Sequence, residues 1–236
     1  MLFGGGELLA EFALKVNKEG RAVFVVTSER HAKEDIFDKA ATLADFLKSK
    51  GIDFTISQDI NTDEAVLSKI TENTLGLSMG SAWIFKPGFI DLFSGKLLNL
   101  HETKLPQDRG GGGLSWVILR NERMGLSLLH MVEVGVDSGY IVAYEEYFYP
   151  PSCRLPVDHQ RYSTSRYLSF LENFIKDIDE GRNFPLTAQQ EYFSSYWPRL
   201  NTDKHGYIDW SWKLTDLEKF INAFDDPYKG AITFVN

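Results

Sequence analysis

Strand-like runs alternate with helical patterns through the first third of the chain. The strand-like runs lie at residues 1–6, 21–27, 54–57 and 75–79, and the helical patterns lie at residues 7–15, 37–50 and from 61 onward. Parallel strands need long crossover connections, which are usually helices, so this alternation predicts parallel pairing. We therefore expect an α/β protein with a Rossmann-like, doubly wound, mainly parallel sheet.

Three polar side chains follow strand-like segments in the middle of the chain. Asn99 and His101 end an apolar run and are two residues apart, so they point the same way on a strand. Another strand is predicted over residues 125–132, and Asp137 lies in a glycine-flanked turn after it. Such a turn can bring its carboxylate to a neighbouring strand end. An amide donor, a near-neutral acid/base and a carboxylate together suit acyl transfer to an amine.

The order of these motifs resembles that of one enzyme family. The motifs are Asn99-Leu100-His101, Leu105-Pro106, Arg109-Gly110 and Asp137-Ser138-Gly139. This combined pattern is similar to that of the 10-formyltetrahydrofolate-dependent formyltransferases, which act on glycinamide ribonucleotide, methionyl-tRNA or the amino sugars of bacterial surface glycans. The resemblance covers residues 75–150 closely and most of the chain loosely. Segments 196–200, 206–210 and 226–231 look most like the sugar N-formyltransferases.

The chain also departs from the family pattern in two places. Glu-Thr-Lys at residues 102–104 replaces the common Pro-Ser-Leu, and four consecutive glycines occupy residues 110–113. Both changes lie outside the trio of Asn99, His101 and Asp137, so they affect expectations about substrate contacts and not about the reaction. Glycine lets a backbone approach a ligand closely at an entropic cost, so the glycine run predicts a substrate-gating loop.

The resemblance implies a role for each motif. Asn99, His101 and Asp137 would be catalytic. The co-substrate N10-formyltetrahydrofolate would be held by two loops, and the residues expected to bind it are Trp83, Ile84, Phe85, Val134, Gly135 and Asp137. Ordinary core packing is the alternative for the three residues at 83–85, but a loop seldom needs three large apolar side chains merely to turn.

The predicted substrate-binding residues come from several parts of the chain. Arg30, His31 and Lys33 follow the strand at 21–27, and the carboxyl ends of strands line the ligand crevice in open α/β sheets. These three residues could therefore meet a phosphate-bearing substrate, and a solvated loop is the alternative. The other residues in this predicted set are Arg109, Gly110, Tyr149 and Tyr162.

Charge and cysteine content exclude several function classes. The net charge is −8, so broad binding of tRNA or of anionic membranes is not expected. Cys153 is the one cysteine, and no Cys/His group has zinc-ligand spacing, so we expect no metal. His130, His159 and His205 have no partner at ligand or triad spacing and are expected to be surface or satisfied histidines. Without a long apolar run or a secretory leader, the expectation is a cytoplasmic protein, and we also expect a homodimer.

The chain is expected to have two parts. Residues 1–180 would form the formyltransferase domain, and residues 181–236 would form a C-terminal extension packed on it, without the separate C-terminal domain of the tRNA-specific enzymes. The glycines at residues 4–6 offer a weaker alternative, a dinucleotide-phosphate loop, because their spacing differs from Gly-x-Gly-x-x-Gly.

The resemblance predicts an N-formyltransferase that acts on a dTDP- or UDP-linked 4-amino-4,6-dideoxy sugar, for surface-glycan (O-antigen) biosynthesis. Aromatic residues from Tyr144 onward favour a nucleotide-linked acceptor, since aromatic faces stack on nucleobases. Alternatives with the same chemistry are a phosphoribosylglycinamide formyltransferase and a formyltetrahydrofolate hydrolase. The non-enzymatic alternative is a folate- or nucleotide-binding module.

Overall fold

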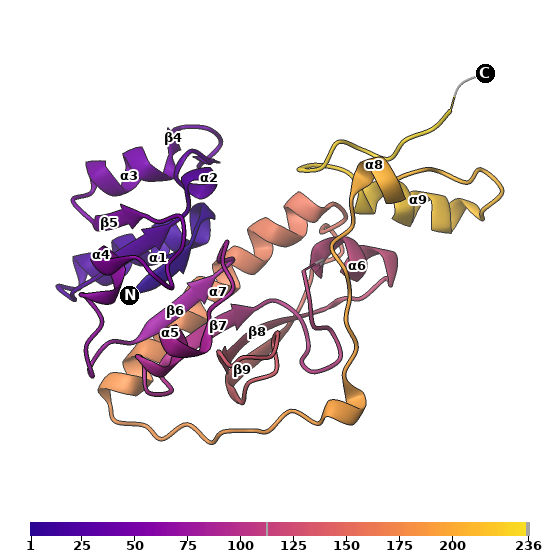
Figure 1. Ribbon diagram of the computed structural model, residues 1–236. Helices are drawn as coiled ribbons and strands as arrows, with labels where there is room; N and C mark the ends of the chain where they lie inside the picture. Colours follow the sequence, from indigo (N-terminus) through magenta and orange to yellow (C-terminus); the bar gives the residue numbers. More distant parts are fainter. Residues whose placement is uncertain (112, 235–236) are drawn as a thin grey trace. The chain divides into compact units, whose positions relative to one another are not determined.

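A seven-stranded sheet in the order β5-β2-β1-β6-β7-β8-β9 is the central feature of the computed structural model, which describes residues 1–111 and 113–234 (Figure 1). Its strands are β1 (Leu2–Gly4), β2 (Phe24–Thr27), β5 (Asp53–Ile56), β6 (Gly76–Met79), β7 (Leu97–His101), β8 (Met124–Met131) and β9 (Ile141–Phe148). β1 pairs in parallel with β2 and β6, β2 with β5, and β6 with β7. The chain runs outward from β1 to β5 and then returns to β6 on the other side of β1. This doubly wound, mainly parallel α/β sheet confirms the predicted fold class.

Helices lie between most of the strands, and three more follow the last strand, β9, in the described part of the sequence. They are α1 (Gly6–Lys18), α2 (Glu29–Ala32), α3 (Leu43–Ser49), α4 (Glu64–Leu67), α5 (Pro87–Asp91), α6 (Gly113–Leu119), α7 (Pro156–Asp179), α8 (Thr202–His205) and α9 (Leu214–Ala223), with a short 3-10 helix η1 (Glu191–Phe193). Asp63 caps α4 by accepting a hydrogen bond from the backbone N–H of Ala65, as expected for an aspartate at that position. Within residues 1–111 and 113–234, no helix is long and apolar enough to cross a membrane.

The helix predicted over residues 37–50 is wrong in its first half. Phe37, Asp38 and Lys39 have φ of 54°, 53° and 67°, which no right-handed helix allows. These residues instead form the turn of a small hairpin made of β3 (Asp35–Ile36) and β4 (Ala41–Thr42). Helix α3 begins only after Thr42, whose hydroxyl accepts a hydrogen bond from the backbone N–H of Asp45.

The chain forms two compact units, each built from several segments. Unit 1 comprises residues 1–101, 129–143 and 171–188, and unit 2 comprises residues 102–128, 144–170 and those from 189 onward. These units interleave along the sequence. The domain boundary predicted near residue 180 stays a prediction.

The core of unit 1 joins the strands to the helices that follow β5 and β6. Phe3, Val26 and Leu97 from three strands pack with Val66 of α4, Phe89 of α5 and their buried neighbours Ile60 and Phe93. Phe3 meets Phe89 edge to face, with ring centroids 5.7 Å apart. Full burial of a side chain of this kind is worth roughly 1.5–3 kcal/mol. This packing anchors β1, β2 and β7 to α4 and α5.

Gly4 shows how closely two of those strand ends approach. Its φ is +136°, and a Cβ on it would lie 1.9 Å from the carbonyl oxygen of Met79 at the end of β6. Only glycine fits such a close approach. Gly4 therefore has a structural role where β1 and β6 end side by side, and a phosphate contact by residues 4–6 stays a prediction.

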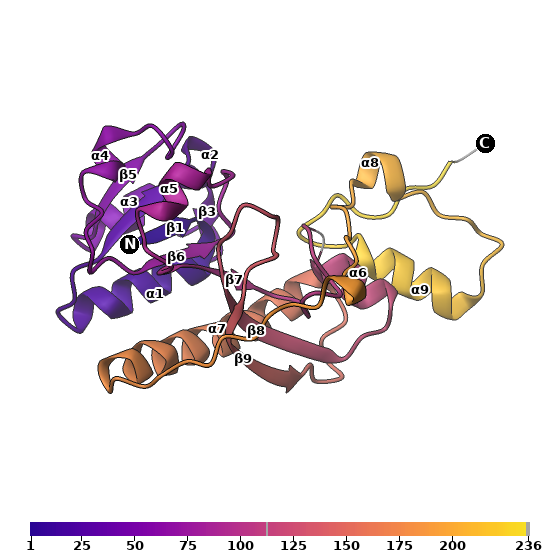
Figure 2. The ribbon, with the colours of Figure 1, turned by 60° about the horizontal axis from the view of Figure 1, so that its bottom comes forward.

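Unit 2 has a smaller core of its own. Helix α6 lies against α9, where Ile118, Ala223 and Phe224 are buried together (Figure 2). The hydroxyl of Ser115 donates a hydrogen bond to the carbonyl of Ala223 at 2.8 Å and links the two helices. The apolar side of α6 thus faces another helix.

Candidate active site

Strand β7 presents Asn99 and His101 on one side. The intervening Leu100 and the preceding Leu98 are buried, as strand alternation requires. Asn99 is half-buried, and His101 is only 8% exposed. Both residues belong to unit 1. The predicted placement of an amide and an imidazole on one face of one strand is therefore confirmed, whereas their chemical roles are not tested by geometry alone.

The turn between β8 and β9 brings Asp137 to these residues. Oδ1 of Asp137 lies 3.9 Å from Nδ1 of His101, and the carboxylate is mostly buried. Asp137 itself has a φ of 50°, an unusual conformation for a residue with a side chain. A carboxylate at this separation in a partly buried site stabilises a positive charge on the imidazole.

Gly139 holds this turn against β8. A Cβ on Gly139 would lie 1.9 Å from the carbonyl oxygen of Met131, so only glycine fits there. We expect Gly139→Ala to lower the free energy of unfolding by about 1–3 kcal/mol, the usual cost of overpacking, and to displace Asp137. Thermal unfolding of Gly139→Ala beside Gly88→Ala measures this, since a Cβ on Gly88 meets nothing within 4 Å. Equal stability of the two variants would contradict a steric role for Gly139.

His130 is a fourth member of the cluster; it is the satisfied, buried histidine that was one of the two expectations, but its partners belong to the predicted trio. The side chain is 2% exposed and lies near the end of β8. Its Nε2 is 3.1 Å from Nδ2 of Asn99 and 3.6 Å from Oδ1 of Asp137. Its ring meets that of His101 edge to face at 5.9 Å. Sequence spacing concealed these contacts because Asn99 and His130 belong to neighbouring strands; a histidine near the end of the strand after the Asn99 strand was the available signal.

The cluster also has the composition of a metal site. His101, His130 and Asp137 each offer one ligand atom, and these atoms lie within 4.8 Å of one another. Imidazole and carboxylate together suit zinc or iron. The expectation that the protein uses no metal therefore stays a prediction.

The loop expected to hold folate is fixed by one asparagine. Asn61 donates from Nδ2 to the carbonyl of Ile84 and accepts at Oδ1 from the backbone N–H of Lys86. Trp83 and Phe85 pack against the core of unit 1, whereas the side chain of Ile84 is 74% exposed. The core-packing alternative thus fits Trp83 and Phe85 in part, and Ile84 is presented outward.

Exposed apolar side chains also occur on the turn that carries Asp137. Val134 is 72% exposed, and Val136 is exposed as well. Gly135 lies between them, and a Cβ there would be 2.4 Å from the hydroxyl oxygen of Ser138. Exposed large apolar side chains can mark a ligand-binding surface, and the predicted folate contact of this turn stays a prediction.

Arg30 and His31 lie in a short helix, α2, and Lys33 is the residue that follows its end, so the segment is not the loop considered from the sequence. Ser28 caps it by accepting a hydrogen bond from the backbone N–H of His31. The His31 ring is buried against Gly5, and its Nε2 lies 2.6 Å from an Nη of Arg30. Lys33 pairs with Glu29 at 2.8 Å on the exposed side of the helix. A phosphate contact by this segment stays a prediction.

Arg109 and Gly110 are tied to a later segment within unit 2. Arg109 donates to the carboxylate of Glu191 at 2.8 Å and to the side-chain oxygen of Gln189. A Cβ on Gly110 would lie 2.5 Å from the carbonyl oxygen of Trp197. Gly110 is thus needed for close packing, and Gly113 begins α6. Gly112 lies outside the described residues, and the predicted gating role of residues 110–113 stays a prediction.

Tyr149 is a core residue, which does not support its predicted contact with substrate. Its side chain is buried, and its hydroxyl is 2.8 Å from that of Ser163. The hydroxyl of Tyr147 donates a hydrogen bond to the same Ser163 hydroxyl. Burial raises the pKa of Tyr149 far above the usual value of a phenol. Tyr162 is half-buried, and its ring lies 5.9 Å from that of Tyr149. Tyr149 is buried because it lies two residues after Tyr147, just after the end of β9, and side chains two apart on a strand point to the same face.

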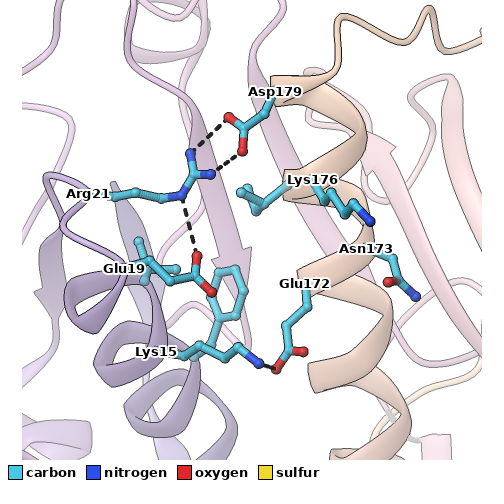
Figure 3. A pocket seen from close by; sticks show the side chains of 10 residues that line it. Lys15, Glu19, Arg21, Glu172, Asn173, Lys176 and Asp179 are labelled. Atoms are coloured by element: carbon cyan, nitrogen blue, oxygen red, sulfur yellow. Dashed lines mark hydrogen bonds and ion pairs between the residues drawn. The ribbon is translucent and has the colours of Figure 1, made fainter.

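Away from this cluster, unit 1 has a hollow beside α1 with a volume of about 320 Å³ (Figure 3). It is lined by residues from the C-terminal halves of α1 and α7 and by Glu19 and Arg21, which follow α1. Its charged side chains pair with one another: Lys15 lies 2.5 Å from Glu172, and Arg21 donates to Asp179. Because these cations are already paired, the hollow is a poor site for an anionic ligand such as a nucleotide or folate.

Comparison with known proteins supports the resemblance seen in the sequence. No family model matches the chain. It is 31% identical over 140 residues to the methionyl-tRNA formyltransferase of Syntrophus aciditrophicus, a match that covers 59% of this chain and 43% of that protein. The chain thus spans less than half the length of this curated relative.

Solved structures extend the similarity to nearly the whole chain. An N-formyltransferase from Helicobacter canadensis, in complex with folinic acid and dTDP-3-aminofucose, superposes with a TM-score of 0.77 at 18% identity and covers 100% of this chain and 83% of that one. The chain has the formyltransferase fold. The sugar 3-N-formyltransferase WlaRD, solved with dTDP and 5-N-formyltetrahydrofolate, gives a TM-score of 0.74 at 19% identity, with 94% and 78% covered. The predicted resemblance to formyltransferases, and to the sugar N-formyltransferases in particular, is therefore confirmed at the level of fold.

Proposed function

We propose that this protein transfers a formyl group from N10-formyltetrahydrofolate to the primary amine of a nucleotide-linked amino sugar. The observation that carries the proposal is the meeting of Asn99, His101 and Asp137 in one partly buried cluster of unit 1. An amide donor, an imidazole and a carboxylate are the groups that formyl transfer to an amine requires.

Each member of the trio has a distinct task. As the amine attacks the formyl carbon, negative charge develops on the formyl oxygen, and N–H donors of Asn99 and protonated His101 stabilise it. Protonated His101 gives its proton to N10 of the folate when the carbon–N10 bond breaks, and the neutral imidazole then takes the proton that the amine nitrogen loses. Asp137 stabilises the protonated imidazole and holds its orientation. The formyl group passes to the amine and tetrahydrofolate leaves.

The donor is supported by the loops of unit 1 and by the neighbouring structures. Ile84 and Val134 offer exposed apolar contacts of the kind that a pterin ring uses. The WlaRD structure contains 5-N-formyltetrahydrofolate, and the Helicobacter enzyme was solved with folinic acid. We assign the pterin-binding role to Trp83, Ile84, Phe85, Val134 and Gly135, as the resemblance implies.

The acceptor is supported by the same neighbours and by charge. The structures of WlaRD and of the Helicobacter enzyme contain dTDP or a dTDP-linked amino sugar. The methionyl-tRNA formyltransferase favours a second candidate acceptor, an aminoacyl-tRNA, but a net charge of −8 opposes binding to a polyanion. We propose a dTDP- or UDP-linked 4-amino-4,6-dideoxyhexose as the acceptor. The protein would act in the cytoplasm, as a homodimer, in the synthesis of surface glycans.

An acceptor competition tests this assignment. The purified protein is incubated with formyltetrahydrofolate and equal concentrations of 4-amino and 3-amino dTDP- and UDP-sugars, glycinamide ribonucleotide and methionyl-tRNA, and products are read by mass spectrometry. We expect a 4-formamido nucleotide sugar and no formylated glycinamide ribonucleotide. The reverse preference would contradict the proposed acceptor.

Two additional samples separate the alternatives that share the donor. Formate release without an acceptor, at the rate seen with one, would identify a hydrolase, and folate binding without any product would identify a binding module. A parallel reaction in EDTA tests the metal-free mechanism, because His101, His130 and Asp137 could hold a metal ion. Loss of activity in EDTA and its return with zinc would overturn that mechanism.

A further inference from the structure

The contacts of His130 determine which of its ring nitrogens carries a proton. Nδ1 lies 2.8 Å from the carbonyl oxygen of Met131. A carbonyl oxygen only accepts hydrogen bonds, so Nδ1 must be the protonated nitrogen. In a neutral ring, Nε2 is then an acceptor. The backbone of β8 thus selects the tautomer of a histidine that faces Asn99.

That tautomer in turn fixes the amide of Asn99. An amide offers an oxygen acceptor on one side and an NH₂ donor on the other, and which side faces a partner follows from the partner's chemistry. Nε2 of His130 lies 3.1 Å from Nδ2 of Asn99 and accepts one of its two hydrogens. The second hydrogen on Nδ2 then remains for another acceptor. A reversed amide would instead set its oxygen against the Nε2 lone pair.

The Asn99 amide is the nearer of two polar groups that face Nε2 of His130. Nδ2 of Asn99 lies 3.1 Å from Nε2, within hydrogen-bond distance, and Oδ1 of Asp137 lies 3.6 Å from it. His130 is also almost fully buried, so water is largely kept from competing for Nε2. The ring therefore acts on Asn99 from a fixed position.

We propose that His130 is a positioning residue, whose ring donates from Nδ1 to the carbonyl of Met131 and accepts at Nε2 from the amide of Asn99, so that the second N–H of Asn99 faces the formyl oxygen. This inference rests on the proposed function, since the formyl oxygen is the group that the amide would meet. His130 reaches the reaction only through Asn99. The carbonyl of Met131 sets the tautomer of His130, and His130 in turn sets the orientation of the Asn99 amide.

Nuclear magnetic resonance tests the tautomer without any activity assay. Nitrogen-15 spectra of the full chain near neutral pH are expected to show His130 protonated at Nδ1 and unprotonated at Nε2, and Asn99→Ala is expected to shift the Nε2 signal. Protonation at Nε2, or an Nε2 signal unmoved by Asn99→Ala, would overturn the proposal. A change of that signal on adding EDTA would also overturn it, because a metal and not Asn99 would then hold Nε2.

Kinetics test whether His130 acts through Asn99. His130→Ala is expected to lower kcat by about 10- to 100-fold with little change in KM for the folate, the scale of loss when an orienting partner is removed. His130→Gln is expected to recover most of that loss, since its Oε1 can accept from Asn99. In an Asn99→Ala background, His130→Ala is expected to cost less than about twofold, because coupled residues are not additive.

A second buried histidine provides the matched control. His159 is also 2% exposed, its Nδ1 also faces a backbone carbonyl, that of Leu155, and it belongs to unit 2. His159→Gln is expected to leave kcat unchanged. Equal losses in His130→Gln and His130→Ala, or full additivity with Asn99→Ala, would overturn the proposal. If the unaltered protein formylates no acceptor, the proposed function fails, while the resonance measurement still decides the His130–Asn99 contact.

Discussion

Replacement of Asp137 with asparagine is expected to lower kcat for formyl transfer by about 10²- to 10⁴-fold, the scale of acid–base assistance. The carboxylate lies 3.9 Å from His101 and 3.6 Å from His130, in a partly buried position. Asparagine keeps the size of the side chain but removes its charge, so the protonated form of His101 loses its stabilisation. Steady-state kinetics with the acceptor found in the competition measure the loss.

Fold and folate binding should survive this substitution. Thermal unfolding and folate titration of the variant check both. Asp53→Asn is the matched control, because Asp53 is an exposed aspartate at the start of β5 in the same unit. Turnover close to that of the control would remove Asp137 from the mechanism.

The sheet was predictable because buried parallel strands are apolar on both faces. β2 therefore appears in the sequence as an almost continuous apolar run, and β6 is as fully buried although it includes Ser78; the helical patterns between such runs indicate parallel pairing. The hairpin of β3 and β4 was not predictable, since Phe37, Asp38 and Lys39 carry no local signal for positive φ. A distant residue contributes to it: Glu7 in α1 accepts a hydrogen bond from the backbone N–H of Phe37 at 2.6 Å. Local patterns do not register such tertiary contacts.

The site was predictable only for the residues whose order along the sequence resembles that of the formyltransferase motifs. Asn99 and His101 share one strand, and Asp137 follows in a glycine-rich turn, so their sequence positions predict a cluster. His130 was missed because its contact with Asn99 joins residues 31 apart along the chain, across two neighbouring strands. Tyr149 was assigned to the substrate because it is aromatic, although strand alternation pairs it with the buried Tyr147. Register across the sheet, which no single segment reveals, decides both cases.

Asn99→Ala and His101→Ala are each expected to lower kcat by about 10²- to 10³-fold, the usual cost of losing one donor to a developing oxyanion. The charge on the formyl oxygen is small in bound substrate and large in the transition state, so these donors bind the transition state more tightly. KM for the folate should therefore change little. Steady-state kinetics in which donor and acceptor are varied separately measure the two parameters.

The combination of the two substitutions distinguishes one shared oxyanion from two separate roles. If Asn99 and His101 donate to the same formyl oxygen, the fold-loss in kcat of the double variant should be smaller than the product of the two single losses. The reason is that loss of either donor already leaves the formyl oxygen poorly placed for the other. Asn99 also receives its orientation through His130, so its loss should make kcat insensitive to the ring at position 130. A large rise in KM for the folate in either single variant would instead make that residue a binding contact. In that case the oxyanion would need another donor.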